Sequence, residues 1–315
     1  MAGLQVVPGE IRSGDRFGAY VHVPYCATRC GYCDFNTYTP GELGNSTTGL
    51  SQSDEVTSYL TAVMAEVELA ARVLSEDGSR ALPIVDTVFI GGGTPTQLAP
   101  DQLGGILRRL DETFGLAPDA EITTEANPES VTARQLAELR TAGFTRISLG
   151  MQSAVEHVLS VLDRSHTPGR ALEAAKQART EGFAHVSLDL IYGTPTESDD
   201  DWRASLQAAI SADVDHISAY ALTVEPGTRM ARQVARGELA MIDDDVLADR
   251  YQLADRILSE AGFSWYEISN WARTPGDRCR HNELYWRGGD WWGFGPGAHS
   301  HAGGVRWWNV KHPAA

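Results

Sequence analysis

The 315-residue chain lacks the segments that would place it in or across a membrane. No apolar run approaches the ~20 residues that a membrane-spanning helix needs. The first 17 residues contain no basic stretch followed by an apolar core, so the sequence predicts no signal peptide. We therefore expect a cytoplasmic protein with no stable membrane insertion.

Positive charge is also scarce. The chain has 26 Lys and Arg against 42 Asp and Glu, a formal net charge of −16. A field of this sign repels phosphate backbones, so we expect no nucleic-acid partner. The apolar and charged shares, 42% and 22%, exclude a disordered or collagen-like chain. The length fits one large domain or two ordinary ones.

Cysteine is rare and unevenly placed. Of four cysteines, Cys26, Cys30 and Cys33 fall within eight residues, and Cys279 is distant. A secreted disulfide framework uses an even, dispersed set. The odd, tight group instead indicates a ligand set for a metal centre in a reducing compartment.

The chain does contain a regular alternation of short β-rich runs and amphipathic helical stretches. The expected strands cover residues 19–23, 87–90, 121–125, 146–149, 185–191, 216–222 and 265–268. The expected helices cover residues 53–74, 101–114, 132–141, 168–181, 200–212 and 244–261. Repeated βα units predict an α/β fold, either an open doubly wound sheet or a closed or partial (β/α) barrel. Residues 39–53 are expected to form a loop, and residues 286–315 a separate loop-rich, Trp-rich region.

A short repeat supports this alternation. A Gly-Phe pair precedes three expected strands, with Gly143, Gly182 and Gly262 as its glycines. Each pair predicts a helix that ends on a left-handed glycine, followed by a phenylalanine packed under the next strand.

The strongest chemical signal is the spacing Cys26-x3-Cys30-x2-Cys33 directly after the first expected strand. Three thiolates can hold three irons of a [4Fe–4S] cubane and leave the fourth open to the amino and carboxylate groups of S-adenosylmethionine (SAM). The alternative is a zinc site, but structural zinc usually takes four ligands in two pairs. Cys279 is expected to be a bystander.

The stretch Tyr-Val-His-Val-Pro-Tyr-Cys-Ala-Thr-Arg-Cys-Gly-Tyr-Cys-Asp-Phe at residues 20–35 resembles the radical SAM signature. More narrowly, the chain from about Gly18 onward resembles the family of oxygen-independent coproporphyrinogen III oxidases and HemW haem chaperones. The resemblance implies a partial (β/α)6 barrel over residues 18–270, an N-terminal extension over 1–17 and a loop-rich C-terminal segment over 271–315. The family usually continues into a further C-terminal domain, whereas this sequence stops at Ala315.

The same resemblance implies a set of SAM contacts. Glycines allow close backbone approach to a ligand, arginine suits a carboxylate, and Asp and Gln suit ribose hydroxyls. The predicted SAM residues are Tyr20, Tyr32, Gly92, Gly93, Thr94, Glu125, Gln152, Arg164, Asp189, Ala221 and His299.

Two further features favour the haem-chaperone branch of the family. Phe35 stands where the oxidases carry a fourth cysteine, which puts decarboxylation in doubt. The segment His-Asn-Glu-Leu-Tyr-Trp at residues 281–286 is associated in that branch with haem binding, so His281, Asn282, Tyr285 and Trp286 are expected haem contacts, with His281 as the leading iron ligand. Alternatively, His281 and Asn282 only orient a loop.

The resulting hypothesis is a haem chaperone that holds a [4Fe–4S] cluster, SAM and haem. Its expected partners are haem, a haem-acceptor protein and an electron donor such as a flavodoxin or ferredoxin, with a homodimer as one further expectation. The alternatives are a coproporphyrinogen III oxidase-type enzyme and a zinc-binding structural protein.

Overall fold

Strands and helices alternate along the chain, as the sequence predicts. The computed structural model describes residues 11, 16–43, 52–76, 78–164, 167 and 169–313. Its strands are β1 (Phe17–Val23), β2 (Val85–Gly92), β3 (Leu116–Ala126), β4 (Arg146–Gln152), β5 (His185–Tyr192), β6 (His216–Ala221), β7 (Ser264–Glu267), β8 (Asn270–Ala272), β9 (Asp290–Phe294), β10 (His299–Ala302) and β11 (Val305–Trp308). Its α-helices are α1 (Pro40–Leu43), α2 (Gln52–Leu74), α3 (Pro100–Phe114), α4 (Ala133–Ala142), α5 (Glu156–Val161), α6 (Arg170–Thr180), α7 (Asp199–Ser211), α8 (Arg229–Ala235), α9 (Asp244–Glu260) and α10 (Arg280–Trp286). Three short 3₁₀ helices are η1 (Pro95–Gln97), η2 (Pro128–Ser130) and η3 (Pro275–Asp277). None of these helices combines the length and hydrophobicity needed to cross a membrane.

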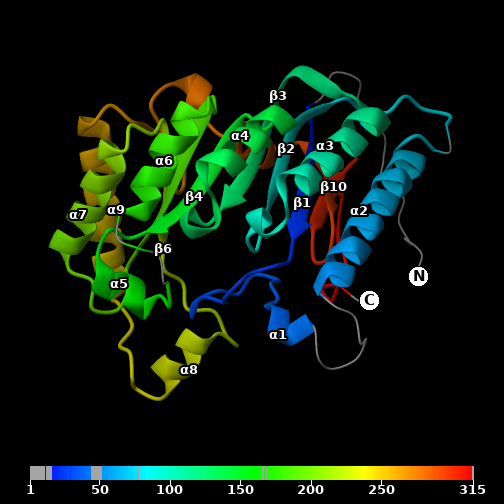
Figure 1. Cartoon of the computed structure of the whole chain (residues 1–315). Helices are drawn as coiled ribbons and strands as arrows, with labels where there is room; N and C mark the ends of the chain where they lie inside the picture. The colour runs from blue at the N-terminus through cyan, green and yellow to red at the C-terminus, as the bar shows by residue number, and fades with distance from the viewer. Residues whose placement is uncertain are drawn as a thin grey trace.

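The strands form an 11-stranded sheet in the order β11-β10-β9-β1-β2-β3-β4-β5-β6-β8-β7. Strands β1 to β6 are parallel and lie side by side in chain order. Beyond β6 the sheet continues through antiparallel β8 and β7 and does not close onto β1. The parallel strands therefore form a partial barrel, and Figure 1 shows α2, α3, α4 and α6 along its outer face.

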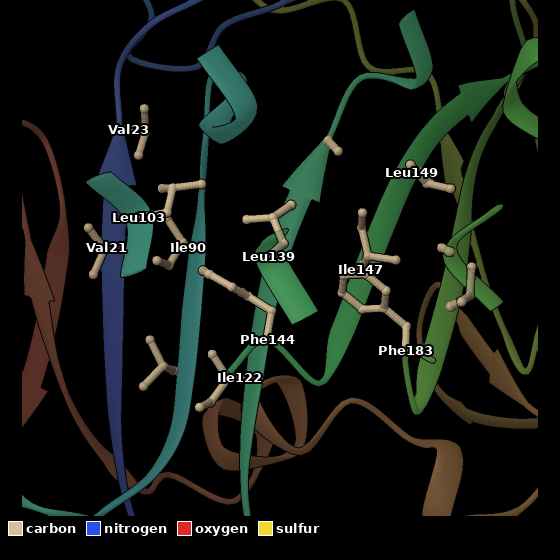
Figure 2. Close-up of a cluster of buried hydrophobic side chains, with 14 of the residues drawn as sticks. Val21, Val23, Ile90, Leu103, Ile122, Leu139, Phe144, Ile147, Leu149 and Phe183 are labelled. Atoms are coloured by element: carbon tan, nitrogen blue, oxygen red, sulfur yellow. The ribbon is translucent and has the colours of Figure 1, made fainter. Parts of the chain in front are cut away.

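Alternation along each strand gives the sheet two different faces. Val21, Ile90, Ile122 and Ile147 point toward the helices and are at most 7% exposed (Figure 2). They pack with helix residues such as Leu139 in one hydrophobic core. Burying each such side chain contributes about 1.5–3 kcal/mol, so this outer layer holds the helices on the sheet. The inner face carries mostly polar residues and borders a cavity.

The three predicted Gly-Phe helix ends are confirmed. At the end of α4, Gly143 has φ +108° and its N–H donates to Arg140 O at 3.0 Å, while Phe144 N donates to Leu139 O at 3.1 Å. This pair of bonds is the Schellman arrangement. The same two bonds recur at Gly182-Phe183 and Gly262-Phe263, and all three phenylalanines are at most 3% exposed.

The structure corrects three expectations about the connecting and C-terminal regions. Residues 290–308 are not a separate loop-rich region, because β9 pairs in parallel with β1 and β10 and β11 extend the same sheet. The strand expected at 265–268 is β7, an antiparallel edge strand rather than part of another βα unit. The expected loop at 39–53 contains the short helix α1, and residues 44–51 lie outside the described residues.

Candidate metal and cofactor site

The three clustered cysteines lie on a loop that leaves β1 and folds back on itself. Cys26 N donates to Tyr38 O at 3.0 Å, and Tyr38 N donates to Pro24 O at 2.7 Å. Cys33 N donates to Cys30 O at 3.2 Å in the turn between them. These bonds bring all three cysteines to the wall of one cavity of about 770 Å³. In Figure 1 this loop runs from the end of β1 toward α1, beyond the ends of the parallel strands.

Two neighbouring side chains donate to the thiols. Arg164 Nη1 lies 3.5 Å from Cys30 Sγ, and Thr94 Oγ1 lies 3.8 Å from Cys26 Sγ. Burial raises the pKa of the Cys26 thiol to about 11 and also raises that of Cys33. Metal binding must therefore displace protons from these thiols, as it does whenever thiolates become ligands.

The separation of the sulfur atoms argues against a single zinc ion. Zn–S bonds of about 2.3 Å hold any two ligand sulfurs within about 4.6 Å of each other. In the described ranges, the group of His, Cys, Asp and Glu whose ligand atoms all lie within 4.8 Å of one another is His185, Asp215 and Asp277, not the cysteines. A [4Fe–4S] cubane does not require this proximity, since each cysteine ligates a different iron.

The glycine-rich turn after β2 passes directly beneath the cysteine loop. Gly92 has φ +113°, and a Cβ atom there would lie 2.6 Å from His22 Cε1. A Cβ atom on Gly93 would lie 2.5 Å from Tyr25 O and 3.0 Å from Cys26 Sγ. The glycines thus permit close approach between two segments of the chain, in addition to any ligand contact.

Two carboxyl groups lie on the inner face of the sheet. Glu125 Oε2 accepts from Gly92 N at 3.1 Å, and Asp189 accepts from Ser148 Oγ at 2.9 Å. Burial, reinforced by the Asp189 charge, raises the pKa of Glu125 to about 8 despite the Gly92 N–H. Burial also raises the pKa of Asp189, although Ser218, Ser148 and Arg164 oppose the shift. Both carboxyls have raised pKa values and are surrounded by hydrogen-bonding groups, as a site for a polar ligand requires.

Gln152 at the end of β4 and Arg164, which follows α5, lie in unusual settings. Gln152 has φ +65°, a left-handed conformation that is uncommon for a residue other than glycine and often marks a ligand site. Arg164 Nη2 donates to Gly150 O at 2.9 Å, while its buried Nε has no partner in the described structure. Arg164 is therefore fixed beside the cysteine loop with one donor unused.

The cavity collects most of the residues predicted to hold the cluster and SAM. It is lined by Cys26, Cys30, Cys33, Tyr32, Gly92, Gly93, Thr94, Glu125, Gln152, Arg164, Asp189 and Ala221. Two predicted SAM residues are not among its lining. The Tyr20 hydroxyl forms a hydrogen bond of 3.0 Å with His22 Nδ1. His299 lies exposed on β10, and its ring stacks on Trp308. The structure does not bring these two to the cavity wall, and SAM binding by the others stays a prediction.

The expectation that His281 ligates haem iron conflicts with its surroundings. His281 is 1% exposed, its Nδ1 lies 2.8 Å from Thr87 Oγ1, and its Nε2 lies 2.8 Å from Tyr285 Oη. Burial lowers its pKa to about 3. Both ring nitrogens are occupied, so His281 holds α10 against β2. Tyr285 and Trp286 also lie outside the cavity lining, whereas Asn282 is part of it.

Sequence reasoning missed several polar residues of the cavity wall. Thr123 on β3, Arg146 and Ser148 on β4 and Ser218 on β6 face inward and line it. Their period-two alternation with the buried apolar residues was the available signal.

Comparison with known proteins agrees with this geometry. The family model of the radical SAM superfamily matches residues 20–209. A Mycobacterium tuberculosis protein named haem chaperone HemW is 57% identical over 99% of this chain and 75% of its own length. The Escherichia coli protein of the same name is 38% identical over 89% of this chain and 68% of its own length. The solved structure of coproporphyrinogen III oxidase (HemN) from Escherichia coli has the same fold, with a TM-score of 0.77 at 24% identity over 95% of this chain and 67% of that one. The chain thus belongs to the radical SAM superfamily and, within it, to the HemW haem-chaperone family.

Proposed function

We propose that this protein is a haem chaperone, which binds haem and passes it to an acceptor protein. The observation that carries the proposal is the 57% identity to a haem chaperone over 99% of this chain. The cysteine loop supports it, because Phe35 stands where the related oxidases have a fourth cysteine. The Phe35 side chain is 62% exposed and lines the cavity.

The cavity residues fit a [4Fe–4S] cluster and SAM. Cys26, Cys30 and Cys33 would hold three irons and leave the fourth for the amino and carboxylate groups of SAM. The unpartnered Nε of Arg164 suits the SAM carboxylate, and Asp189 suits a ribose hydroxyl. When bound, the cluster and SAM supply one-electron chemistry that the chain's own side chains lack.

The proposed partners follow from this role. A haem chaperone needs an acceptor protein, and reduction of a bound cluster needs an electron donor, for which a flavodoxin or ferredoxin is the proposed class. We also propose that the protein is located in the cytoplasm and that it forms a homodimer.

The alternative function is decarboxylation of coproporphyrinogen III. The likeness to the Escherichia coli oxidase concerns the fold. Under anaerobic reducing conditions with SAM, the reconstituted protein is expected to give no protoporphyrinogen at multiple turnovers. Formation of protoporphyrinogen over multiple turnovers would overturn the chaperone proposal and show that the protein is an oxidase.

The direct test is anaerobic reconstitution with iron and sulfide, followed by haem titration and transfer of the bound haem to an apo-haemoprotein. We expect broad iron–sulfur absorption, saturable haem binding and transfer. A variant with Cys26, Cys30 and Cys33 replaced by Ala controls for haem that binds without the cluster. Absence of saturable haem binding to the reconstituted protein would overturn the proposal.

A further inference from the structure

The end of the cavity opposite the cysteine loop is closed by the segment that leads into α10. Arg146 Nη2 donates to Asp277 O at 2.9 Å and to Arg278 O at 3.0 Å. Arg280 N donates to Glu121 Oε1 at 2.8 Å. We call the inner surface formed here by Thr123, Arg146 and Asn282 the cavity floor; all three residues line the cavity.

The floor contains a buried arginine with an unused donor. Arg146 is 1% exposed, and its Nε and Nη2 are bonded to Glu121 Oε2 at 3.0 and 2.9 Å. Its Nη1 is buried and has no hydrogen-bond partner in the described structure. A buried polar group left unpaired costs about 1–3 kcal/mol, and more when it is charged, so this donor calls for an acceptor.

A second unused donor lies beside it. Thr123 on β3 is the register partner of Arg146 on β4, is fully buried, and has no partner for its Oγ1. The neighbouring inward hydroxyls differ, because Ser148 Oγ bonds Asp189 and Ser187 Oγ bonds His216 Nδ1 at 2.7 Å. Two adjacent, buried, unpaired donors on one cavity wall favour a ligand with an oxygen acceptor.

The SAM site does not account for this floor. Arg146 and Gly150, the residue that positions Arg164, are four residues apart on β4, which is about 13 Å along a strand. A SAM carboxylate bound at the cysteine loop would therefore lie near Gly150, far from Arg146. The unpaired donors of the cavity floor are thus available to a ligand other than SAM.

We propose that Arg146 and Thr123 bind a carboxylate group at the cavity floor, and that this group is a propionate of the haem cargo. A carboxylate accepts charge-assisted hydrogen bonds from both a guanidinium and a hydroxyl. Asn282 on the same floor comes from the segment 281–286, so that segment takes part in haem binding through the cavity rather than through His281 as an iron ligand. This inference rests on the proposed haem-chaperone function.

The test compares haem with haem dimethyl ester, in which both propionates are blocked, on the reconstituted protein. Thr123→Val removes the unused hydroxyl and should leave folding intact, since no protein group bonds it. Thr124→Val is the comparison variant, because Thr124 is equally buried on the same strand but faces the helices, where its hydroxyl donates to Glu125 O at 3.2 Å. Arg146→Lys is a second variant that keeps the charge beside Glu121.

We expect Thr123→Val to weaken haem binding about tenfold, the size of one charge-assisted hydrogen bond, and Arg146→Lys to weaken it at least as much. Neither variant should change the affinity for the ester or for SAM, and Thr124→Val should match the wild type in all three titrations. Equal haem affinity in Thr123→Val and wild type would overturn the floor site, as would equal affinity of the wild type for haem and its ester. Both results leave the chaperone function standing, whereas a wild type that binds no haem overturns the floor site and the proposed function together.

Discussion

Replacement of Gly93 by Ala tests how closely the glycine turn supports the cysteine loop. The added Cβ atom would lie 2.5 Å from Tyr25 O, 0.9 Å short of the 3.4 Å at which ordinary contact begins. The same oxygen accepts from Thr94 N at 2.7 Å, and Cys26 Sγ lies 3.0 Å from the new atom. The cysteine loop must therefore move, and overpacking of this kind costs about 1–3 kcal/mol.

Gly105→Ala is the matched control. Gly105 lies within α3, and its added Cβ would meet only side-chain atoms at 3.7 and 3.8 Å. Since alanine is a better helix former than glycine, this variant should gain about 0.5–1 kcal/mol. Urea unfolding of the apo-protein measures both changes, and iron content after reconstitution measures the effect on the cluster. We expect lower stability and lower iron only in Gly93→Ala. If that variant matches the wild type in both measurements, the close packing of turn and loop is refuted.

The remaining predictions concern the thiols, the carboxyls and His281. Replacing Cys26, Cys30 or Cys33 by Ala should remove most of the iron, whereas Cys279→Ala should retain it; iron loss in the latter would contradict the ligand assignment. Asp189→Ala should weaken SAM binding by about 1.5–3 kcal/mol by equilibrium titration, and unchanged affinity in a folded variant would remove Asp189 from the site. Because the pKa of Glu125 is about 8 in the folded protein against an ordinary 4.5, the folded state keeps a proton that the unfolded chain releases, so stability should fall as the pH rises from 4.5 to 8. In Glu125→Gln, the midpoint of urea unfolding should fall less steeply with pH than in the wild type. Identical pH profiles for the two proteins would show that Glu125 does not keep its proton in the folded state. His281→Ala should destabilise the fold by about 1–3 kcal/mol, because it leaves the buried Thr87 hydroxyl unpaired, and should leave the haem Soret band unshifted. A shifted band in a folded variant would restore His281 as the iron ligand.

Local patterns in the sequence were sufficient for the parts of the protein that depend on near neighbours. The spacing of Cys26, Cys30 and Cys33 predicts one ligand set because a short loop cannot carry them far apart. Strand and helix periodicity predicts the parallel strands and the main helices, since each element buries one face whatever its neighbours are. The Gly-Phe helix ends follow from backbone geometry alone, because Gly143 and its counterparts must adopt positive φ.

Only the tertiary structure decided which of the suggested residues meet. His281 has the residue type of a haem ligand, but its bond to Thr87 joins positions 194 residues apart and fixes it inside the fold. The pairing of β9 with β1 turns a Trp- and Gly-rich stretch into part of the sheet, and no local pattern carries that information. Arg146 and Thr123 gain their significance from strand register, which sets them side by side with unpaired donors on one cavity wall. A sequence specifies which side chains are present and how they alternate, whereas burial and hydrogen-bond partnership depend on contacts between distant segments that exist only once the sheet has formed.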